Sequence, residues 1–240
     1  MAKLYSGTSG FAYDQWKPGF YPADVRSKKF LNHYATRLNA VEINYTFRRL
    51  PSASTLQNWV EQTAPGFVFA LKAHQKLTHI LRLKKNEFTE VFFKAIDPLR
   101  VTGRLGPVLF QLPPNMKCDG ARLSEFLATL PASLPVAFEF RHASWFCEDV
   151  YERLRAHRGG GAALCLAESE ERETPEVVTG PLVYYRWRKP SYSAEERAAM
   201  VEKIRGHVAA GRDVYAYFKH EETPEGALYA VEMKKALEGV

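Results

Sequence analysis

The strongest constraint on the fold is a repeated alternation between short strand-like segments and longer segments with helical spacing. Eight segments are rich in β-branched and aromatic residues, and many have Gly or Pro close by, as strands do. These segments are 4–10, 40–47, 67–73, 107–113, 136–142, 162–168, 182–188 and 214–220. Strands that alternate with helices indicate parallel pairing, because a parallel neighbour needs a long crossover connection. Eight such units in 240 residues therefore predict an α/β fold, a single (β/α)8 TIM barrel.

The segments between most of these strands carry apolar residues at helical spacing, which predicts helices. Asp24 and Ser52 are candidate N-caps of the first two helices, because such side chains accept hydrogen bonds from free backbone amides. Ser193 is a third candidate, and Glu196 three residues later completes a capping box. The later helices are expected at 87–101, 121–129, 148–157, 193–210 and 225–238. The sixth connection, 168–180, holds at most one helical turn.

No break in composition and no low-complexity linker divides the chain, so we expect one domain over residues 1–240. An open doubly wound sheet is the alternative, but it needs a GxGxxG turn after an early strand, and Gly7 and Gly10 do not make one. The first residues lack an apolar segment behind a basic one, and no stretch approaches the roughly 18 apolar residues of a membrane span. We therefore expect a cytoplasmic protein without a membrane segment.

Cysteine content and charge limit the function further. Cys118, Cys147 and Cys165 lie far apart and form no CxxC spacing. An odd number cannot pair fully within the chain, so the pattern disfavours a disulfide framework and a structural zinc site. The formal net charge is +6, with Lys and Arg interspersed among Glu and Asp. This charge fits a soluble basic surface, and it also fits the attraction of an anionic ligand.

Alternation along the strands indicates which side chains face the barrel interior. In the second strand, Val41 and Ile43 are expected to face the helices, which leaves Glu42 and Asn44 inside. The same phase places further residues inside, namely Ala70, Lys72, Leu109, Gln111, Ala137, Glu139, Arg141, Tyr184 and Arg186. The polar members come late in their strands, and parallel strands share one carboxyl-terminal face, where barrel active sites lie. We therefore expect these groups to converge on one mouth.

Several motifs are similar to those of a known family. In chain order they are GTSGFAYDQWK, FYP, VEINYTFRRLP, KAHQKLTH, FQLPP, EFRHASW and YYRWR. On these motifs the chain closely resembles, over nearly its whole length, the DUF72 or YecE-like family, a group of TIM barrels without an established activity. The resemblance implies the barrel fold independently of the strand pattern. It implies very little about chemistry.

The sequence departs from the family pattern late in the chain. Where the family usually has YxRxHG, this chain reads YYRWRK at 184–189, without the His-Gly. Where the last strand of the family usually ends in Phe-Asn-Asn, this chain reads FKH at 218–220. Both changes make one corner of the mouth more cationic, and they leave the roles of those family positions open.

Glu42, Glu139 and His142 are the candidate catalytic residues. A cation such as Arg141 beside a carboxylate favours the ionised form, which acts as a base or as a ligand. The imidazole of His142 titrates near neutral pH, as a general acid or base requires. Structural roles are the alternatives. They are a salt bridge between Glu139 and Arg141 at the top of the barrel, and a hydrogen-bonded histidine after the strand.

Lys72, Arg141 and Arg186 are expected on three strands of the same mouth. Three cations against two carboxylates leave one excess positive charge, which favours a ligand that carries phosphate or carboxylate. The full set of candidate substrate-binding residues is Asn44, Lys72, His79, Gln111, Arg141, Trp145 and Arg186. The sequence therefore favours an enzyme for a small anionic substrate, and it leaves the reaction and any cofactor unassigned.

A divalent-metal-dependent barrel enzyme is one alternative. Oxygen and nitrogen ligands are available from Glu42, His79, Glu139, His142 and Glu168. The cations of the same mouth oppose a metal ion, and no HxH or ExxH pair is present, so no residue is assigned as a metal ligand. A glycosidase, which needs two carboxyl groups, is disfavoured because Gln111 and Arg186 stand where many barrel glycosidases carry them.

A nucleic-acid-binding protein is the non-enzymatic alternative. Its support is two short basic clusters, made of Arg26, Lys28 and Lys29 and of Arg82, Lys84 and Lys85. No RNP, KH, zinc-finger or helix-turn-helix signature accompanies them, so the support for a nucleic-acid partner is weak.

Overall fold

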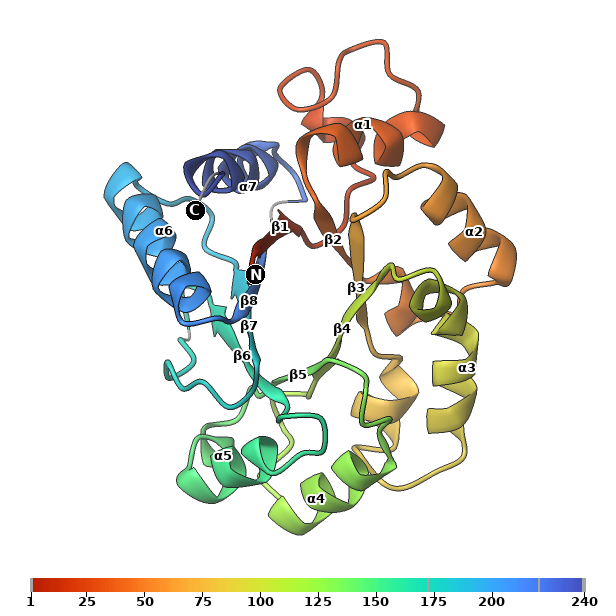
Figure 1. Ribbon diagram of the computed structural model, residues 1–240, viewed down its shortest axis with the longest axis vertical. Coiled ribbons are helices and arrows are strands. Elements are labelled where there is room, and N and C mark those ends of the chain that lie inside the picture. Colours follow the sequence, from red (N-terminus) through yellow and green to blue (C-terminus); the bar gives the residue numbers. More distant parts are fainter. Residues whose placement is uncertain (1, 172, 220, 239–240) are drawn as a thin grey trace.

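The computed structural model describes residues 2–171, 173–219 and 221–238. Eight parallel strands form one sheet in the order β1-β8-β7-β6-β5-β4-β3-β2, and helices surround it (Figure 1). The strands are β1 (Leu4–Thr8), β2 (Ala40–Ile43), β3 (Val68–Lys72), β4 (Leu105–Gln111), β5 (Val136–Glu139), β6 (Ala163–Glu168), β7 (Leu182–Trp187) and β8 (Asp213–Phe218). The helices are α1 (Phe30–Arg37), α2 (Ala53–Glu61), α3 (Phe88–Val101), α4 (Gly120–Thr129), α5 (Glu148–Arg155), α6 (Ala194–Ala209) and α7 (Glu225–Ala236). The predicted (β/α)8 TIM barrel is confirmed.

The seam between β1 and β2 closes the barrel largely through side chains. The side-chain amide of Asn39 makes hydrogen bonds to the backbone of β1 that a neighbouring strand would otherwise make. Its Oδ1 accepts a hydrogen bond from Ser6 N at 2.8 Å, and its Nδ2 donates to Leu4 O at 2.8 Å. Gly7 lies at the closest approach, because a Cβ added there would lie 2.1 Å from the carbonyl oxygen of Ala40. Only glycine lets the two backbones come this near.

Tyr34 of α1 extends the same seam toward the carboxyl ends of the strands. Its hydroxyl accepts a hydrogen bond from Thr8 N at 2.8 Å and donates to Ala40 O at 3.0 Å. Ser9 and Glu42 then form a parallel bridge at the end of the seam. The backbone of Glu42 therefore helps to close the barrel at the point where its side chain enters the mouth.

The barrel interior is filled by side chains of very different size. Alanines come from β2, β3, β5 and β6, and tyrosines come from β1, β7 and β8. They are Ala40, Ala70, Ala137 and Ala163, and Tyr5, Tyr184, Tyr215 and Tyr217. The rings of Tyr5 and Tyr215 stack with their centroids 4.5 Å apart. The interior is thus a packed core below the mouth, as in other barrels of this size.

Apolar residues on the other side of the strands pack against the helices. Phe138 of β5 stacks on Phe110 of β4 with centroids 5.1 Å apart, and Phe126 of α4 packs edge-on against Phe138 at 6.5 Å. This layer covers the helix side of the sheet, which is how parallel sheets bury both of their faces. Among the described residues, none of the helices combines the length and the apolarity needed to cross a membrane.

Two of the predicted N-caps are confirmed. The hydroxyl of Ser52 accepts a hydrogen bond from Thr55 N at the start of α2. Ser193 and Glu196 form the predicted capping box at the start of α6, with each side chain bound to the backbone of the other. These bonds satisfy amides that the first helical turn leaves free.

The predicted cap at Asp24 is wrong. α1 begins only at Phe30, after the short 3-10 turn Ser27–Lys29, and the residue before it has no side-chain cap. The apolar face that this helix buries begins at Phe30, and of residues 25–29 only Val25 is partly buried, so little packing holds a helix directly after Asp24. The sixth connection has no helix in its described residues, 169–171 and 173–181, in agreement with its weak pattern.

Two strands, β2 and β5, end at least three residues earlier than predicted. β2 ends at Ile43, and Asn44 has a helical backbone (φ −90°, ψ −13°) at the start of the 3-10 turn Tyr45–Phe47. β5 ends at Glu139, so Arg141 belongs to the loop that follows. Strand alternation therefore holds for Glu42 and Glu139 but does not extend to Asn44.

Candidate functional site

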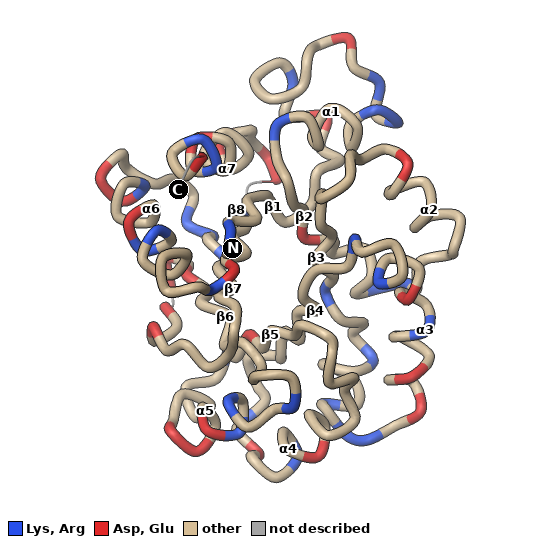
Figure 2. Tube along the Cα trace, in the orientation of Figure 1, with Lys and Arg blue, Asp and Glu red and all other residues tan. Residues whose placement is uncertain are grey.

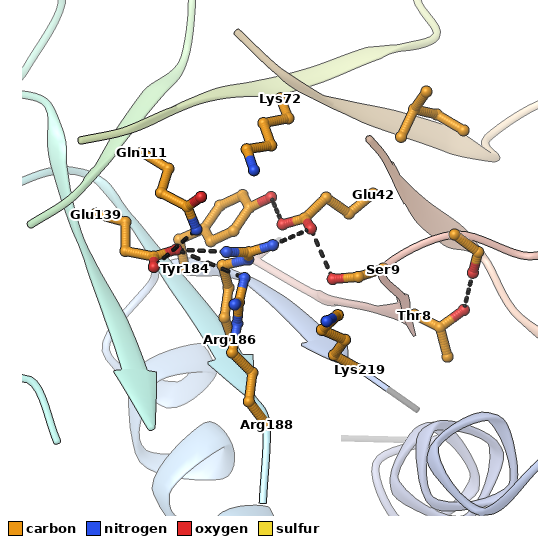
Figure 3. A network of polar contacts seen from close by, with 12 residues as sticks. Thr8, Ser9, Glu42, Lys72, Gln111, Glu139, Tyr184, Arg186, Arg188 and Lys219 are labelled. Atoms are coloured by element: carbon orange, nitrogen blue, oxygen red, sulfur yellow. Dashed lines mark hydrogen bonds and ion pairs between the residues drawn. The ribbon is translucent and has the colours of Figure 1, made fainter. Parts of the chain in front are cut away.

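One guanidinium and two carboxylates occupy the carboxyl-terminal end of the barrel interior (Figure 3). Nη2 of Arg186, from β7, donates to Oε1 of Glu42, from β2, at 2.6 Å. Nη1 of the same residue binds Oε2 of Glu139, from β5. All three side chains are at most 3% exposed. Arg186 thus links three strands that are not neighbours in the sheet.

Glu42 is held from both sides. The Ser9 hydroxyl donates to Oε1 at 2.6 Å, beside the bond from Arg186. The Tyr184 hydroxyl donates to Oε2 at 2.8 Å. Each oxygen of Glu42 therefore has at least one donor, which stabilises a buried carboxylate.

Glu139 is held in the same way. Its Oε1 accepts hydrogen bonds from Gln111 Nε2 at 2.8 Å and from Arg141 Nε at 3.0 Å. Burial acts to raise the pKa of Glu139, but the attraction of Arg186 and Arg141 outweighs burial and lowers the pKa to about 2. The carboxylate is therefore ionised at neutral pH, and with Glu42 it forms a framework that positions Arg186.

Arg186 keeps its charge in this setting. Burial acts to lower the pKa of Arg186, and the two carboxylates reverse this effect and raise the pKa well above its usual value. Within the described part of the chain, its buried Nε has no hydrogen-bond partner, and neither does the buried hydroxyl of Tyr217. Buried polar atoms without a partner are uncommon, and a water or a ligand group commonly satisfies them.

Lys72, the last residue of β3, extends toward this network (Figure 3). Its Nζ lies 4.1 Å from the centroid of the Phe47 ring. Among the described residues, no carboxylate lies within ion-pair distance of this amine. Burial lowers the pKa of Lys72, Arg186 adds to this effect, and the more distant carboxylates only partly oppose it, so the pKa falls to about 8.

The loop between β3 and α3 has an unusual backbone. Lys76–Ile80 form a π-helical turn, and Arg82 and Leu83 have positive φ angles of 48° and 63°. Such angles are strained for residues with a side chain, and they persist where packing enforces them, as it does for the fully buried Leu83. Single π-helical turns and backbone strain both occur often at functional sites.

His79 lies on this π-helical turn, beside the same phenyl ring as Lys72. Its ring packs edge-on against Phe47 with centroids 5.0 Å apart, and its Nδ1 is 2.9 Å from the Thr78 hydroxyl. Burial lowers the pKa of His79, and the cations Lys72 and Arg141 lower it further. The imidazole is therefore neutral at neutral pH, close to the mouth.

A cavity of about 330 Å³ opens beside the network, over the ends of β5 to β8. Arg141, Arg188 and Lys219 line it with positive charge, and each follows a different strand. Arg188 is 18% exposed and lies 3.9 Å from Glu139 through Nη2, and its buried Nε has no partner among the described residues. Lys219 is half-buried and pairs with Glu221 at 3.4 Å.

Acidic residues also line the cavity, but cations from outside it hold two of them. Glu139 binds Arg186, and Glu168 binds Lys189, and neither of these cations is part of the lining. In the central cluster, four cations, Lys72, Arg141, Arg186 and Arg188, stand against the two carboxylates Glu42 and Glu139. The cluster thus has a formal excess of two positive charges.

Most of the predicted site residues meet at this mouth. Glu42, Lys72, Gln111, Glu139, Arg141 and Arg186 form the cluster, and His79 lies beside it. Asn44 lies elsewhere, in a separate cavity with Tyr13 and Trp59. The early end of β2 explains this difference.

His142 and Trp145 also lie outside the cluster. His142 caps the 3-10 turn Ala143–Trp145, where its Nδ1 accepts from Ser144 N at 3.2 Å. Trp145 is fully buried, stacks on Phe140 with centroids 4.6 Å apart, and donates from Nε1 to Met116 O at 2.7 Å. Trp145 therefore presents no surface to a ligand in this structure.

Several residues of the mouth were not among the predicted site residues, and Ser9, Phe47 and Arg188 are three of them. Ser9 binds Glu42, Phe47 lies next to Lys72, and Arg188 lines the cavity. The only signal for any of them was the cationic YYRWRK segment, which contains Arg188. Strand alternation did not identify Ser9 or Phe47, because β1 ends at Thr8 and β2 ends at Ile43, before these residues.

The metal alternative gains no support from the geometry. Among the described residues, no three His, Cys, Asp or Glu side chains are grouped as a metal site requires. Glu42 and Glu139 face a guanidinium, and Glu168 faces the amine of Lys189. The carboxylates proposed as metal ligands are thus held by cations.

The predicted nucleic-acid interaction remains a prediction. Lys28 and Lys29 lie in the 3-10 turn before α1, and Arg26 directly precedes this turn. The second basic cluster, Arg82, Lys84 and Lys85, lies before α3. Around the outside of the barrel, Lys and Arg residues alternate with Asp and Glu residues (Figure 2). The tube therefore shows mixed charge rather than a stripe of one sign.

Known proteins similar to this chain support the same architecture. A DUF72 family protein of Thermotoga maritima has 28% identity and a TM-score of 0.85, and the match covers 98% of this chain and 99% of that one. A DUF72 family protein of Enterococcus faecalis has 17% identity and a TM-score of 0.76, over 100% and 99% of the two chains, which supports the fold alone.

A curated relative and a family model complete the comparison. The UPF0759 protein YunF of Bacillus subtilis (strain 168) is 29% identical over 157 residues, and the match covers 62% of this chain. It covers 55% of the length of YunF. The model of the family described as "Protein of unknown function DUF72" matches residues 5–239. The chain therefore belongs to the DUF72 family.

Proposed function

We propose that the protein is an enzyme that binds a small anionic molecule at the carboxyl-terminal mouth of the barrel and acts on it there. The molecule carries a phosphate or a carboxylate group. The observation that carries this proposal is the convergence of Arg141, Arg188 and Lys219 from three different strand ends on one cavity.

The charges of the site support an anion rather than a neutral ligand. Arg186 is occupied by Glu42 and Glu139, so it serves as the fixed centre of the mouth rather than as a ligand contact. Arg141 and Arg188 are the guanidinium groups nearest the cavity, and a planar guanidinium can bind a carboxylate or a phosphate through two parallel hydrogen bonds. Arg141, Arg188 and Lys219 share the cavity lining with Glu139, Glu168 and Glu173. Glu139 and Glu168 are paired with cations from outside the lining, and unneutralised cations in a cleft with low-dielectric walls concentrate anions from solution.

The size and place of the cavity support a small molecule. A volume of about 330 Å³ lies at the lower end of the range for small-molecule sites. The cavity lies over strand ends at the carboxyl-terminal face, where barrel enzymes hold their substrates. We include the cytoplasmic location in the proposal, since it matches a protein that acts on a small soluble metabolite.

A thermal-shift series tests this proposal. Phosphate, sulfate and citrate are titrated at fixed ionic strength, with chloride as the reference. We expect phosphate or citrate to raise the melting temperature of the wild-type protein, because a ligand that binds only the folded state stabilises it. Arg205 of α6, which is only partly buried and lies outside the cavity lining, provides a matched control. Arg205→Met should keep the full shift, whereas Arg188→Met should reduce it. Equal shifts for the two variants would place the anion elsewhere.

A further inference from the structure

The amine of Lys72 differs from the other cations of the mouth in what surrounds it. Arg186 and Arg141 each bind a carboxylate, and Arg188 lies 3.9 Å from one. Lys72 has no carboxylate partner among the described residues, and its Nζ lies 4.1 Å from the centroid of the Phe47 ring. Glu42 and Glu139 lie near it, but other donors already bind their oxygens.

From this arrangement we infer that Lys72 is a nucleophile that forms a Schiff base with the carbonyl group of the anionic substrate. The inference rests on the proposed function and names the substrate class, a small aldehyde or ketone that also carries a carboxylate or a phosphate. Lys72 is not part of the lining of the cavity, but it lies close enough to Arg141 for the two charges to interact. In this inference Arg141 holds the anionic end of the substrate, and the carbonyl group lies on the β3 side of Arg141.

The chemistry needs a neutral amine, and the site favours one. A lysine in an apolar setting next to other cations loses its proton more readily, which activates it as a nucleophile. Here the pKa of about 8, lowered first by burial and then by Arg186, agrees with the geometry. The carboxylates do not cancel the effect, because Arg186 lies between them and holds both.

The step balances without a further reactant. The neutral Nζ attacks the carbonyl carbon, a C–N bond forms as the C=O π bond breaks, and one proton moves from the nitrogen to the oxygen to give a carbinolamine. The carbinolamine then loses its oxygen as water, and a positively charged iminium group remains on Lys72. One proton from solvent is consumed overall. His79, neutral and beside the same phenyl ring, is placed to exchange protons during these transfers.

Borohydride trapping tests the inference. The protein is incubated with pyruvate or with dihydroxyacetone phosphate, sodium borohydride is added, and the modified peptide is located by mass spectrometry. At pH 7.5 the neutral fraction of an amine with a pKa near 8 is roughly two hundred times that of an ordinary lysine, so reduced adduct should concentrate on Lys72. The exposed Lys94 of α3 serves as the reference site on the same chain.

Three outcomes separate the possible failures. Adduct on Lys72 that rises as the pH passes through 8, and that Lys72→Met and Lys72→Arg both abolish, supports the inference. Anion binding without adduct, or adduct spread evenly over exposed lysines, overturns the inference and leaves the proposed function standing. If the protein shows no anion binding and forms no adduct, both the inference and the proposed function are overturned. Circular dichroism of Lys72→Met and Lys72→Arg checks that both variants fold. The control variant Lys94→Met should form as much reduced adduct on Lys72 as the wild type does.

Discussion

Arg186 and Glu139 form an ion pair that is almost closed to solvent, with side-chain exposures of 2% and 3%. The same guanidinium binds Glu42 on the far side of the mouth. Burial of a charge is costly unless a partner compensates it, so each member of this triad depends on the others. The triad therefore holds the mouth together, and the ligand contacts fall to the cations around it.

Replacing Glu139 with Gln should destabilise the protein substantially. The change removes a charge that Arg186 and Arg141 both contact, and breaking a buried pair costs about 3–5 kcal/mol. In a chain of this length this cost lowers the melting temperature by roughly 6–20 °C. Glu202→Gln is the matched control, because the Glu202–Arg205 pair is exposed and is expected to contribute under about 1 kcal/mol. Similar melting temperatures for the two variants in calorimetry would show that the triad is not structural.

Acid should remove this stabilisation in a defined pH window. The pKa of Glu139 is about 2 in the folded state, below its ordinary value of 4.5. The stability that Glu139 contributes is therefore fully present above about pH 4.5 and is lost as the pH falls toward 2. The difference in unfolding free energy between the wild type and Glu139→Gln should shrink across this window, measured by urea unfolding. A difference that stays constant from pH 5 to pH 3 would contradict the lowered pKa.

Lys72→Met should stabilise the protein at neutral pH. The pKa of Lys72 falls to about 8 on folding from an ordinary value of 10.5. Below pH 8 the amine is charged in the folded state, and this charge lowers the free energy of unfolding. This reduction disappears as the pH rises through this range, because both states then carry a neutral amine. We expect the variant to melt a few degrees above the wild type at pH 7 and at nearly the same temperature at pH 10.5. A lower melting temperature for Lys72→Met at pH 7 would indicate that the charged amine stabilises the fold.

Tyr34→Phe tests the unusual seam between β1 and β2. The variant removes one hydroxyl that serves Thr8 N and Ala40 O, and it leaves both buried backbone groups without that partner. A buried group left unsatisfied costs about 1–3 kcal/mol. Hydrogen exchange should show faster exchange of the Thr8 amide in the variant than in the wild type, with little change in β5. Unchanged protection at Thr8 would mean that the seam is closed by other contacts.

The barrel was predictable because its signals are local. Eight strand-like segments, the helical spacing between them and the capping residues Ser52 and Ser193 each act within a few residues. Strand alternation also placed Glu42, Glu139 and Arg186 inside, since this phase depends only on the residues of each strand.

The pairing within the mouth was not predictable in the same way. Arg186 was expected among the cations that contact a ligand, but two carboxylates from opposite sides of the barrel occupy it. Which charge meets which depends on contacts across the interior, and sequence spacing carries no information about them. The isolation of Lys72 follows from the same pairing, so it also becomes visible only in three dimensions.

Residues that follow the strand ends were also difficult to place from the sequence. Asn44 follows a strand that stops one residue earlier, and its side chain leaves the mouth. Trp145 has the aromatic character of a pocket wall, yet it stacks fully buried against Phe140. Apolar pattern alone cannot separate an aromatic side chain of the core from one that lines a cavity.

Titration calorimetry with citrate and with phosphate tests the central claim most directly. Wild type, Arg141→Met, Arg188→Met and the control Arg205→Met are compared at one ionic strength and at pH 7. We predict saturable binding by the wild type and by Arg205→Met, and at least tenfold weaker binding by Arg141→Met and Arg188→Met, since each loses a charge-assisted contact. Absence of saturable binding by the wild type, or equal affinity in all four proteins, would contradict an anion site at the mouth of the barrel.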